Sequence, residues 1–309
     1  MQVDHKGLAV EVVCIASWNA DLVSRVPQPL ARGETMMASA FSVSPGGKGS
    51  NAAVAAARQG AQVALVARIG DDDFGAMGRR LWQAEGIDTR HVEIAPGERS
   101  GVAQILVYAD GDNSIAVYPG AGAALGTQQV QAAHATLAAC KVVMASCEVP
   151  LAATQAAFAF ARAGGACTVL NPAPACPLPA ELLALVDVLT PNESELHALA
   201  GTPPGSDVDA AAQQMLLRGP RAVLVTLGAA GIRLYRSGHA PVQMTGRAVQ
   251  VCDTIGAGDT FTGALAAALA RGAGLEEAAD HANAAAALSV TGIGAVDAMP
   301  TLQQVLDFL

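Results

Sequence analysis

Short, continuous apolar runs alternate along the chain with longer stretches in which alanine and leucine recur at helical spacing. Uninterrupted apolar runs are typical of strands buried on both faces, and the stretches between them are typical of covering helices. The alternation therefore predicts a mainly parallel sheet with helices on both sides. The predicted strands span 8–17, 62–69, 141–146, 166–170, 185–190 and 221–226, and the predicted helices span 50–60, 73–85, 127–139, 151–164 and 206–218.

Two segments, 19–45 and 100–120, depart from this alternation because they carry period-two patterns and turn residues. The clearer of them, "GVAQILVYADGDNSIAVYPG", has a turn between two strand-like halves, which predicts a β-hairpin. We expect the two segments to pair into one small sheet that projects from the main body. The last third of the chain predicts short strands near 232–236 and 241–251 and helices near 258–271 and 275–290.

Composition limits the classes of partner. Of the 309 residues, 52% are hydrophobic and 15% are charged, and the net charge is −9. An acidic balance disfavours a nucleic-acid partner, and no apolar run is long enough to predict a transmembrane helix. A phosphorylated ligand is compatible with this charge, because backbone N–H groups can bind anions on an acidic protein.

The six cysteines form no C-x-x-C pair and have no zinc-ligand spacing. The N-terminal "MQVDHKG" lacks the basic-then-apolar order of a signal peptide. Together these features predict buried, reduced thiols and a cytoplasmic protein.

The most informative stretch is "DTIGAGDTF" (253–261), a glycine-rich turn that enters an alanine-rich helix. Unpaired N–H groups in the first helical turn form an anion site, which the small residues Gly256, Ala257 and Gly258 leave accessible. A carboxylate beside such a site, here Asp259, can accept a proton from an attacking hydroxyl. The spacing is equally compatible with Asp259 as a simple N-cap.

A second glycine-rich stretch, "PGGKGSN" (45–51), also precedes an alanine-rich helix. It is not a Walker A loop, because Lys48 is followed by glycine. Two interpretations are open: a ligand-binding loop that presents Lys48 and Asn51, or a plain tight turn.

Carboxylates also follow two of the predicted strands. Glu148 comes directly after a strand in "ASCEVP", and "TPNESEL" places Asn192 three residues before Glu195. Open α/β sheets bind ligands at the carboxyl ends of their strands, where Asn192 and Glu195 could orient magnesium-bound water. The alternative for these two residues is a capping box.

Taken in this order, the motifs resemble those of the PfkB family of carbohydrate kinases, and within it the ribokinase branch. The resemblance runs over nearly the whole chain, and "DTIGAGDTF" is close to a family signature by itself. The other stretches that carry it are "SWNADLV" (17–23), "GGKGSN" (46–51), "IGDDDFG" (69–75), "NPAPA" (171–175), "TPNESE" (190–195) and "VTLGAAG" (225–231).

The resemblance implies a ribokinase-like α/β fold: a three-layer α/β/α sandwich with a mainly parallel central sheet and a small β-sheet lid. In this division the kinase core comprises 1–18, 46–99 and 121–309, and the discontinuous lid comprises 19–45 and 100–120. The lid often forms the dimer contact in ribokinase-like proteins, so we expect a homodimer through the lid.

The resemblance also implies roles for individual residues. Asp259 matches the catalytic base that deprotonates the sugar hydroxyl, and Gly256, Ala257 and Gly258 match the anion hole. Further sugar contacts are implied for Asn19, Asp21, Gly47, Lys48, Asn51 and Glu148. The nucleotide pocket is implied for Thr226, Gly228, Gly231 and Asn283, and the organisation of the nucleotide phosphates and of magnesium, through water, is implied for Asn192 and Glu195.

The ribokinase branch also binds a monovalent cation, usually potassium, largely through backbone carbonyls. In this sequence Gly292 stands where a basic residue is often found, and Ala298 stands where a hydroxyl group could reach the cation. The sequence therefore departs from the usual pattern at this site. The residues that match the potassium site are Asp253, Ile255, Ser289, Gly292 and Gly294.

The resulting hypothesis is an ATP-dependent kinase that uses Mg²⁺ and K⁺ and converts D-ribose to D-ribose 5-phosphate. Alternatives of the same class are a nucleoside, deoxyribose or 2-keto-3-deoxygluconate kinase. Trp18 and Pro45 lie beside the proposed sugar site and could either reshape it or simply pack.

A catalytically silent sugar or nucleotide sensor is the alternative of a different class, and the presence of Asp259 argues against it. A Rossmann dehydrogenase is disfavoured, because no G-x-G-x-x-G follows the first strand.

Overall fold

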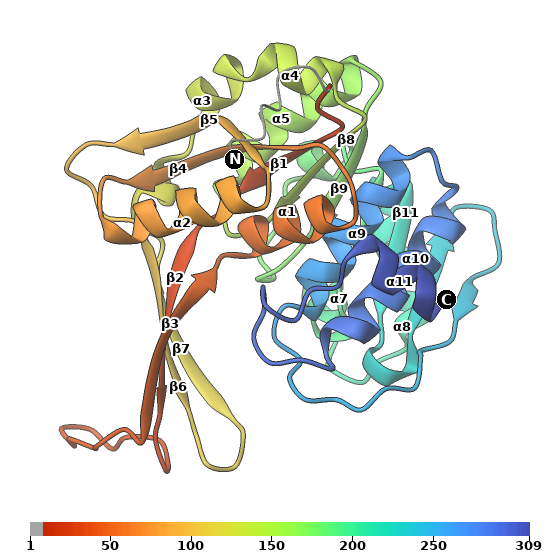
Figure 1. Ribbon diagram of the computed structural model, residues 1–309. Helices are drawn as coiled ribbons and strands as arrows, with labels where there is room; N and C mark the ends of the chain where they lie inside the picture. The colour runs from red at the N-terminus through yellow and green to blue at the C-terminus, as the bar shows by residue number, and fades with distance from the viewer. Residues whose placement is uncertain (1–8) are drawn as a thin grey trace.

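The computed structural model describes residues 9–309, so the start of the expected strand 8–17 and of the expected core segment 1–18 lie outside the described residues. Figure 1 shows a large layered body from which a long, narrow β-sheet extends. No helix within residues 9–309 combines the length and the apolar character needed to cross a bilayer.

The body is built on a nine-stranded sheet with the order β13-β12-β11-β10-β9-β8-β1-β4-β5. Every pairing from β5 across to β11 is parallel, and β12 and β13 are added antiparallel at one edge. The strands are β1 (Val12–Ala16), β4 (Val63–Gly70), β5 (Asp88–Ala95), β8 (Val142–Ser146), β9 (Cys167–Asn171), β10 (Val188–Leu189), β11 (Ala222–Thr226), β12 (Ile232–Arg236) and β13 (Val242–Met244).

Helices cover both faces of this sheet, which gives three layers. One face packs against α1 (Lys48–Arg58), α2 (Asp73–Ala84), α9 (Ala257–Ala270), α10 (Leu275–Ser289) and α11 (Leu302–Phe308). The other packs against α3 (Thr127–Ala132), α4 (His134–Ala139), α5 (Leu151–Ala163), α6 (Ala180–Leu183), α7 (Glu193–Ala200) and α8 (Val208–Leu217). Two short 3₁₀ helices, η1 (Gly120–Ala124) and η2 (Gly228–Ala230), lie in connections.

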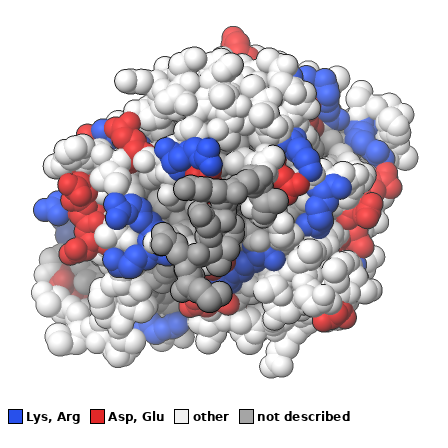
Figure 2. Space-filling model, turned by 45° about the horizontal axis from the view of Figure 1, so that its top comes forward, with Lys and Arg blue, Asp and Glu red and all other residues white. Residues whose placement is uncertain are grey.

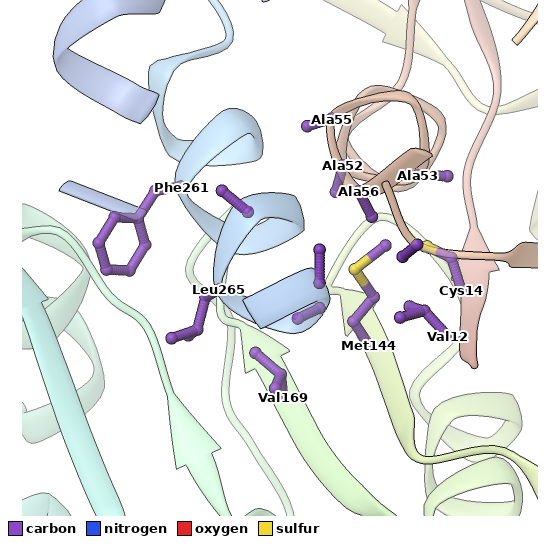
Figure 3. Close-up of a cluster of buried hydrophobic side chains, with 14 of the residues drawn as sticks. Val12, Cys14, Ala52, Ala53, Ala55, Ala56, Met144, Val169, Phe261 and Leu265 are labelled. Atoms are coloured by element: carbon purple, nitrogen blue, oxygen red, sulfur yellow. The ribbon is translucent and has the colours of Figure 1, made fainter. Parts of the chain in front are cut away.

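The two cores follow from the alternation of side chains along each strand. On β9, Val169 faces the α1 and α9 side while Leu170 faces the opposite side. Figure 3 shows Met144 directed at the alanines of α1 and Val169 beside Leu265 of α9. Small residues let these two helices approach closely: a Cβ on Gly263 of α9 would lie 2.7 Å from the Cβ of Ala55 in α1.

The extended sheet has four strands in the order β3-β2-β6-β7. Its central pair, β2 and β6, is parallel, and each outer strand pairs antiparallel as a hairpin. The two segments that the sequence set apart thus form one sheet, as expected. Its strands are β2 (Asn19–Arg25), β3 (Ala40–Gly46), β6 (Gly101–Val107) and β7 (Asn113–Tyr118).

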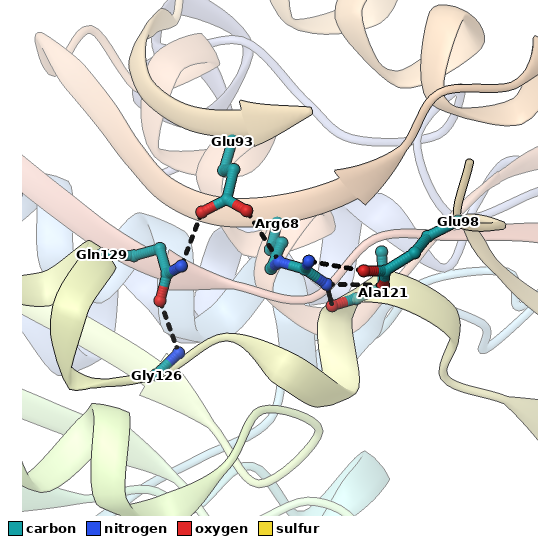
Figure 4. Close-up of polar contacts among 6 residues, drawn as sticks. All are labelled: Arg68, Glu93, Glu98, Ala121, Gly126 and Gln129. Carbon is teal, nitrogen blue, oxygen red and sulfur yellow. Dashed lines mark hydrogen bonds and ion pairs between the residues drawn. The ribbon is translucent and has the colours of Figure 1, made fainter. Parts of the chain in front are cut away.

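Arg68 supplies several of the contacts that tie this small sheet to the body (Figure 4). Arg68 of β4 donates to both carboxylate oxygens of Glu98, at 2.7 Å each, to the carbonyl oxygen of Ala121 and to Glu93. Because Glu98 precedes β6 and Ala121 follows β7, one side chain holds both ends of the second hairpin against the central sheet.

The remaining differences from the sequence analysis concern element boundaries and elements that were not expected, among them the helices α6, α7 and α11. The expected helix 127–139 is divided at Ala133 into α3 and α4, and the expected strands 185–190 and 241–251 shrink to β10 and β13. Strand β5 was not expected, because its sequence "DTRHVEIA" is half polar. It pairs only with β4 and forms an edge of the sheet, where polar side chains reach solvent.

The surface carries few charges, in keeping with the composition. Figure 2 shows one face on which Lys and Arg side chains are interspersed with Asp and Glu between broad neutral areas. A nucleic-acid partner needs an extended basic field. The mixed charges on the visible face do not form one.

Candidate active site

Two adjoining cavities lie at the carboxyl ends of the parallel strands, where open α/β sheets place their ligand sites. The larger has a volume of about 490 Å³ and a mostly apolar lining, and the smaller has about 180 Å³ and a mostly polar lining. They meet at the start of α9, so one ligand can extend through both. The residues that line both cavities are Thr226, Thr254, Ala257, Gly258 and Phe261.

The N-terminus of α9 opens into both cavities. Gly256 is the N-cap and has φ 79°, a left-handed conformation that favours glycine. Within residues 9–309, the backbone N–H groups of Gly258 and Asp259 have no hydrogen-bond acceptor, and no atom lies within 4 Å of the position of a Cβ on Gly258. Free N–H groups beside open space, at the positive end of a helix dipole, form an anion site. The open helix start lies at the residues expected to form the anion hole, but its free N–H groups are those of Gly258 and Asp259, because the N–H of Ala257 donates to the carbonyl oxygen of Thr254 at 3.3 Å.

Asp259 is the third residue of α9, so the interpretation of this residue as a simple N-cap is wrong. Its side chain is only 6% exposed and accepts a hydrogen bond from Nδ2 of Asn51 at 2.9 Å. Burial raises the pKa of Asp259 to about 6, although the nearby Lys48 ammonium and the Asn51 hydrogen bond oppose the rise. A carboxylate with a pKa near neutrality, held in one orientation beside an anion site, is suited to general-base catalysis.

Three further carboxylates and one ammonium group surround Asp259. Burial, followed by repulsion from Glu148 and Asp259, raises the pKa of Asp21 to about 7. Burial lowers the pKa of Lys48, but attraction to these carboxylates and to Glu195 more than compensates, so the pKa is raised and the ammonium is retained. The tertiary structure therefore brings together five of the residues expected at the site, from β2, α1, α7, α9 and the end of β8.

The glycines of "PGGKGSN" serve close packing. A Cβ on Gly47 would lie 2.9 Å from the carbonyl oxygen of Ser17, and a Cβ on Gly49 would lie 2.5 Å from Cα of Ala16. Gly46 leaves room for the carboxyl group of Asp21, which a Cβ would overlap. The tight-turn interpretation is thus correct for the glycines, while Lys48 and Asn51 still face the site.

Glu148 has a structural contact that sequence reasoning did not anticipate. Its Oε2 accepts from the backbone N–H of Lys48 at 2.8 Å and from the hydroxyl of Ser17 at 2.7 Å. Lys48 is the first residue of α1, so Glu148 caps that helix. The capping contacts use Oε2, and Oε1 makes no hydrogen bond within the described residues.

Asn192 and Glu195 form the capping box that was the alternative for this motif. Oδ1 of Asn192 accepts from the N–H of Glu195 at 2.8 Å, and Oε2 of Glu195 accepts from the N–H of Asn192 at 2.9 Å. Both residues also line the smaller cavity. Capping α7 thus holds them at the cavity wall, and a structural and a binding role are compatible.

The residues expected in the nucleotide pocket line the larger cavity. Thr226 ends β11, Gly228 and Gly231 frame η2, and Asn283 lies on α10. Asn283 donates from Nδ2 to the carbonyl oxygen of Thr245 at 3.0 Å, which leaves its Oδ1 without a protein partner within residues 9–309.

The residues expected at the potassium site come from two segments that lie side by side. The N–H of Cys252 donates to the carbonyl oxygen of Val290 at 2.7 Å, and the N–H of Gly294 donates to Oδ2 of Asp253 at 2.9 Å. Oδ1 of Asp253 accepts from the N–H of Ile255, so both carboxylate oxygens brace the loop. Gly292 packs against Ala298, with 2.9 Å between the position of a Cβ on Gly292 and the Cβ of Ala298.

Asn19 and Trp18 lie where the chain enters the small sheet. Asn19 is buried and pairs with Gly46 and Gly101 in the β-ladder. Trp18 packs edge-on against Trp82 and donates from Nε1 to the carbonyl oxygen of Phe74 at 3.1 Å. Of the two roles considered for Trp18, packing is therefore the correct one.

Several cavity residues were missed by sequence reasoning. Ser17 bridges Glu148 and the N–H of Gly49, and Asn171 and Thr190 line the smaller cavity at the ends of β9 and β10. Their signal was a polar residue at the end of an apolar strand, the same signal that identified Glu148. Thr254, Phe261 and Arg247 are among the other lining residues that were missed.

Comparisons with known proteins agree with this geometry. The sequence profile of the pfkB family carbohydrate kinases matches residues 10–302. A ribokinase from Haemophilus influenzae is 39% identical over 297 residues, which cover 96% of this chain and 97% of the relative. A deoxyribokinase from Salmonella typhi is 34% identical over 303 residues, which cover 97% of this chain and 99% of the relative.

Solved structures give the same result. A ribokinase from Arabidopsis thaliana, described in complex with ribose and ATP, superimposes with a TM-score of 0.89 at 31% sequence identity, and the match covers 97% of this chain and 99% of that one. The chain belongs to the PfkB family of carbohydrate kinases. It is an ATP-dependent phosphotransferase with a sugar hydroxyl as acceptor, and its fold is ribokinase-like.

Proposed function

We propose that the protein transfers the γ-phosphoryl group of ATP to the O5 hydroxyl of D-ribose and so forms D-ribose 5-phosphate. The observation that carries the mechanism is the position of Asp259, which Asn51 orients at the open N-terminus of α9, where the two cavities meet. The names of the relatives support ribose as the acceptor.

In this proposal the adenosine part of ATP occupies the larger cavity and the phosphates extend into the smaller one. Asp259 accepts the proton of the sugar hydroxyl as its oxygen attacks the γ-phosphorus, and the bond to the β–γ bridging oxygen breaks. The N–H groups of Gly258 and Asp259 stabilise charge on the transferring group. Lys48 keeps its ammonium charge in this site and balances part of the negative charge.

The smaller cavity fits a magnesium ion, because carboxylates outnumber ammonium groups around it. Glu195 would hold Mg²⁺ through water, with Asn192 beside it, and the ion would neutralise charge on the phosphates. Mg²⁺ usually keeps several water ligands and binds through one or two carboxylates and the substrate phosphates, and not in a cage made only of protein side chains. Within residues 9–309, no cluster of three or more His, Cys, Asp or Glu side chains is arranged for a metal.

We propose that the adjoining segments 252–255 and 290–294 hold a potassium ion through backbone carbonyls. Asp253 braces the loop instead of offering a free carboxylate, and Ala298 supplies no hydroxyl. We propose that Asp253, Ile255, Ser289, Gly292 and Gly294 surround such an ion and that it acts by ordering the loop before α9.

We further propose that 19–45 and 100–120 form a lid on a core made of 1–18, 46–99 and 121–309, and that two copies associate through their lids. Asn19 and Asp21 of β2 would contact the sugar, so lid movement would couple to sugar binding. Large apolar side chains on the small sheet are exposed, Phe41 by 64% and Ile115 by 55%. Val117, which is 54% exposed, points to the same face of the sheet as Ile115, and neighbouring exposed apolar side chains of this kind mark association surfaces.

The test is ADP release from Mg-ATP with D-ribose, 2-deoxyribose, fructose, adenosine, inosine and 2-keto-3-deoxygluconate, each with and without potassium. We expect the highest kcat/KM on D-ribose and stimulation by potassium. The similarity to a deoxyribokinase makes 2-deoxyribose the second candidate, and a higher kcat/KM on that sugar would replace ribose in the proposal. No turnover on any of the six acceptors would contradict the proposed function.

A further inference from the structure

Three neighbouring strands end in uncharged polar side chains on the same face of the sheet. Val169 of β9, Val188 of β10 and Leu224 of β11 all pack on the α9 side. Since side chains alternate along a strand, the residue two positions later points to the same side. These residues are Asn171, Thr190 and Thr226, and all three line the smaller cavity.

The side chain of Asn171 differs from that of Thr190 in lacking any protein partner within residues 9–309. The hydroxyl of Thr190 donates to the carbonyl oxygen of Leu170 at 3.4 Å, whereas the side chain of Asn171 makes no hydrogen bond within residues 9–309. Asn171 is nevertheless only 6% exposed. The oxygen and nitrogen of its amide are not themselves fully buried, so the small exposed part of this residue is its polar end, which opens into the cavity. An amide in this position hydrogen-bonds to a ligand or to water.

The surroundings of Asn171 indicate which ligand group it contacts. Lys48 lines the same cavity, and its Nζ has no carboxylate within 4.0 Å in the described part of the chain. The free N–H groups of Gly258 and Asp259 belong to the same cavity. Donors from a strand end, a lysine and a helix N-terminus therefore share one small polar space, which suits the oxygens of a phosphoryl group.

We propose that Asn171 is a catalytic residue that donates a hydrogen bond from Nδ2 to an oxygen of the phosphoryl group during transfer. This inference rests on the proposed function. The donor would act from the side of the sheet, while the N–H groups of α9 act from the helix. Donors on two sides hold the phosphoryl group in line between the sugar hydroxyl and the leaving oxygen.

The experiment compares Asn171→Ala and Asn171→Asp with the wild-type enzyme. Removal of one donor to the transition state lowers kcat by about 10²–10³. We expect a loss of this size for Asn171→Ala with a sugar KM within about threefold of wild type, because ground-state sugar binding does not use the amide. Asn171→Asp should lose at least as much activity, because it replaces the donor with a negative charge.

A binding measurement separates contact with the phosphoryl group from a structural role. Aluminium fluoride with Mg-ADP imitates the transferring group, so Asn171→Ala should bind this combination at least about tenfold more weakly while its affinity for Mg-ADP alone stays within about threefold. Equal losses for both ligands, or a kcat within about threefold of wild type, would overturn the proposal.

Thr168→Val is the matched control. Thr168 is a buried polar residue on the same strand, but at its other end, where its hydroxyl bonds to Leu185 and Asp187. It should lower the melting temperature without lowering kcat below that temperature. Turnover by the wild-type enzyme supports the proposed function whatever the result for Asn171→Ala. If none of the six acceptors is phosphorylated, the aluminium fluoride comparison still tests the role of Asn171.

Discussion

The helices α1 and α9 begin with similar sequences but have opposite surroundings. Each follows a glycine-rich turn, is rich in alanine and packs against the other. At α1 the first N–H groups are satisfied: that of Lys48 by Glu148, that of Gly49 by the hydroxyl of Ser17, and that of Ser50 by a carbonyl oxygen. At α9 the corresponding groups of Gly258 and Asp259 have no acceptor in the described chain.

The comparison shows that a glycine-rich helix start is an anion site only where the fold leaves it open. The glycines of α1 permit close contact with residues 16–18, whereas Gly258 faces open space. The two helix starts are joined by one hydrogen bond, from Asn51 to Asp259. A closed start therefore orients the proposed catalytic base at an open one. Four predictions test this contrast, in order of decreasing effect.

Asp259→Asn should remove the base while keeping the hydrogen bond from Asn51, since an amide oxygen can accept it. General-base catalysis contributes about 10²–10⁴ in rate, so kcat should fall by about that factor. Affinities for ATP and sugar, measured by calorimetry, should change little. A kcat close to wild type would show that Asp259 is not the base and that the open helix start works without it.

Paired alanine substitutions should separate the two helix starts. Gly49→Ala places a methyl group against the backbone of residues 16 and 17, and overpacking of this kind costs about 1–3 kcal/mol. Gly258→Ala meets open space and should leave the free energy of unfolding unchanged or raise it, because alanine favours helix. Its added methyl group should obstruct the phosphate and lower kcat/KM for ATP.

Denaturant unfolding and steady-state kinetics check this pair. Loss of stability by Gly258→Ala, with kcat/KM for ATP unchanged, would mean that the start of α9 is closed in the same way as that of α1.

The raised pKa of Asp259 predicts opposite pH trends for activity and stability. Activity needs the carboxylate, so kcat/KM should fall below about pH 6. The pKa of Asp259 is about 6 in the folded protein and 3.8 ordinarily, so folding favours the protonated carboxyl group. The stability that the protonated group contributes is therefore lost as the pH rises through about 6.

Asp259→Asn should therefore raise the free energy of unfolding more at pH 8 than at pH 4.5. A difference of about two pKa units corresponds to on the order of 2–3 kcal/mol. Thermal unfolding at both pH values checks this, and equal effects at the two would contradict the assigned burial of an ionised group.

Ser17→Ala should weaken the closed start of α1. It removes the acceptor of the buried Gly49 N–H and the donor to Glu148, and an unsatisfied buried group costs about 1–3 kcal/mol. We expect a lower melting temperature and a modest rise in sugar KM, because Glu148 loses one of two contacts that hold it. An unchanged melting temperature would show that water replaces the hydroxyl and that this helix start is less closed than its contacts indicate.

The sequence alone predicted the architecture well, because the relevant signals are local. Alternation of apolar runs with helical stretches predicted the central sheet, and the period-two segments predicted the second sheet. The edge strand β5 was missed because its half-polar sequence lacks the continuous apolar pattern of a buried strand. It is a strand because it pairs with β4, and that pairing is on one side only. Helix 127–139 was predicted as continuous because nothing in its pattern announces the break at Ala133.

Residue types also predicted the candidate site, but not how its members meet. That a carboxylate follows a glycine-rich turn, or that a polar residue ends an apolar strand, can be read from order along the chain. That Asp259 is buried against Asn51, and that Asp21 and Lys48 share its charge environment, depends on contacts between segments far apart in sequence. Packing between these segments determines which groups are buried, and burial shifts their pKa values. Packing also determines that the start of α1 is covered and that the start of α9 is open.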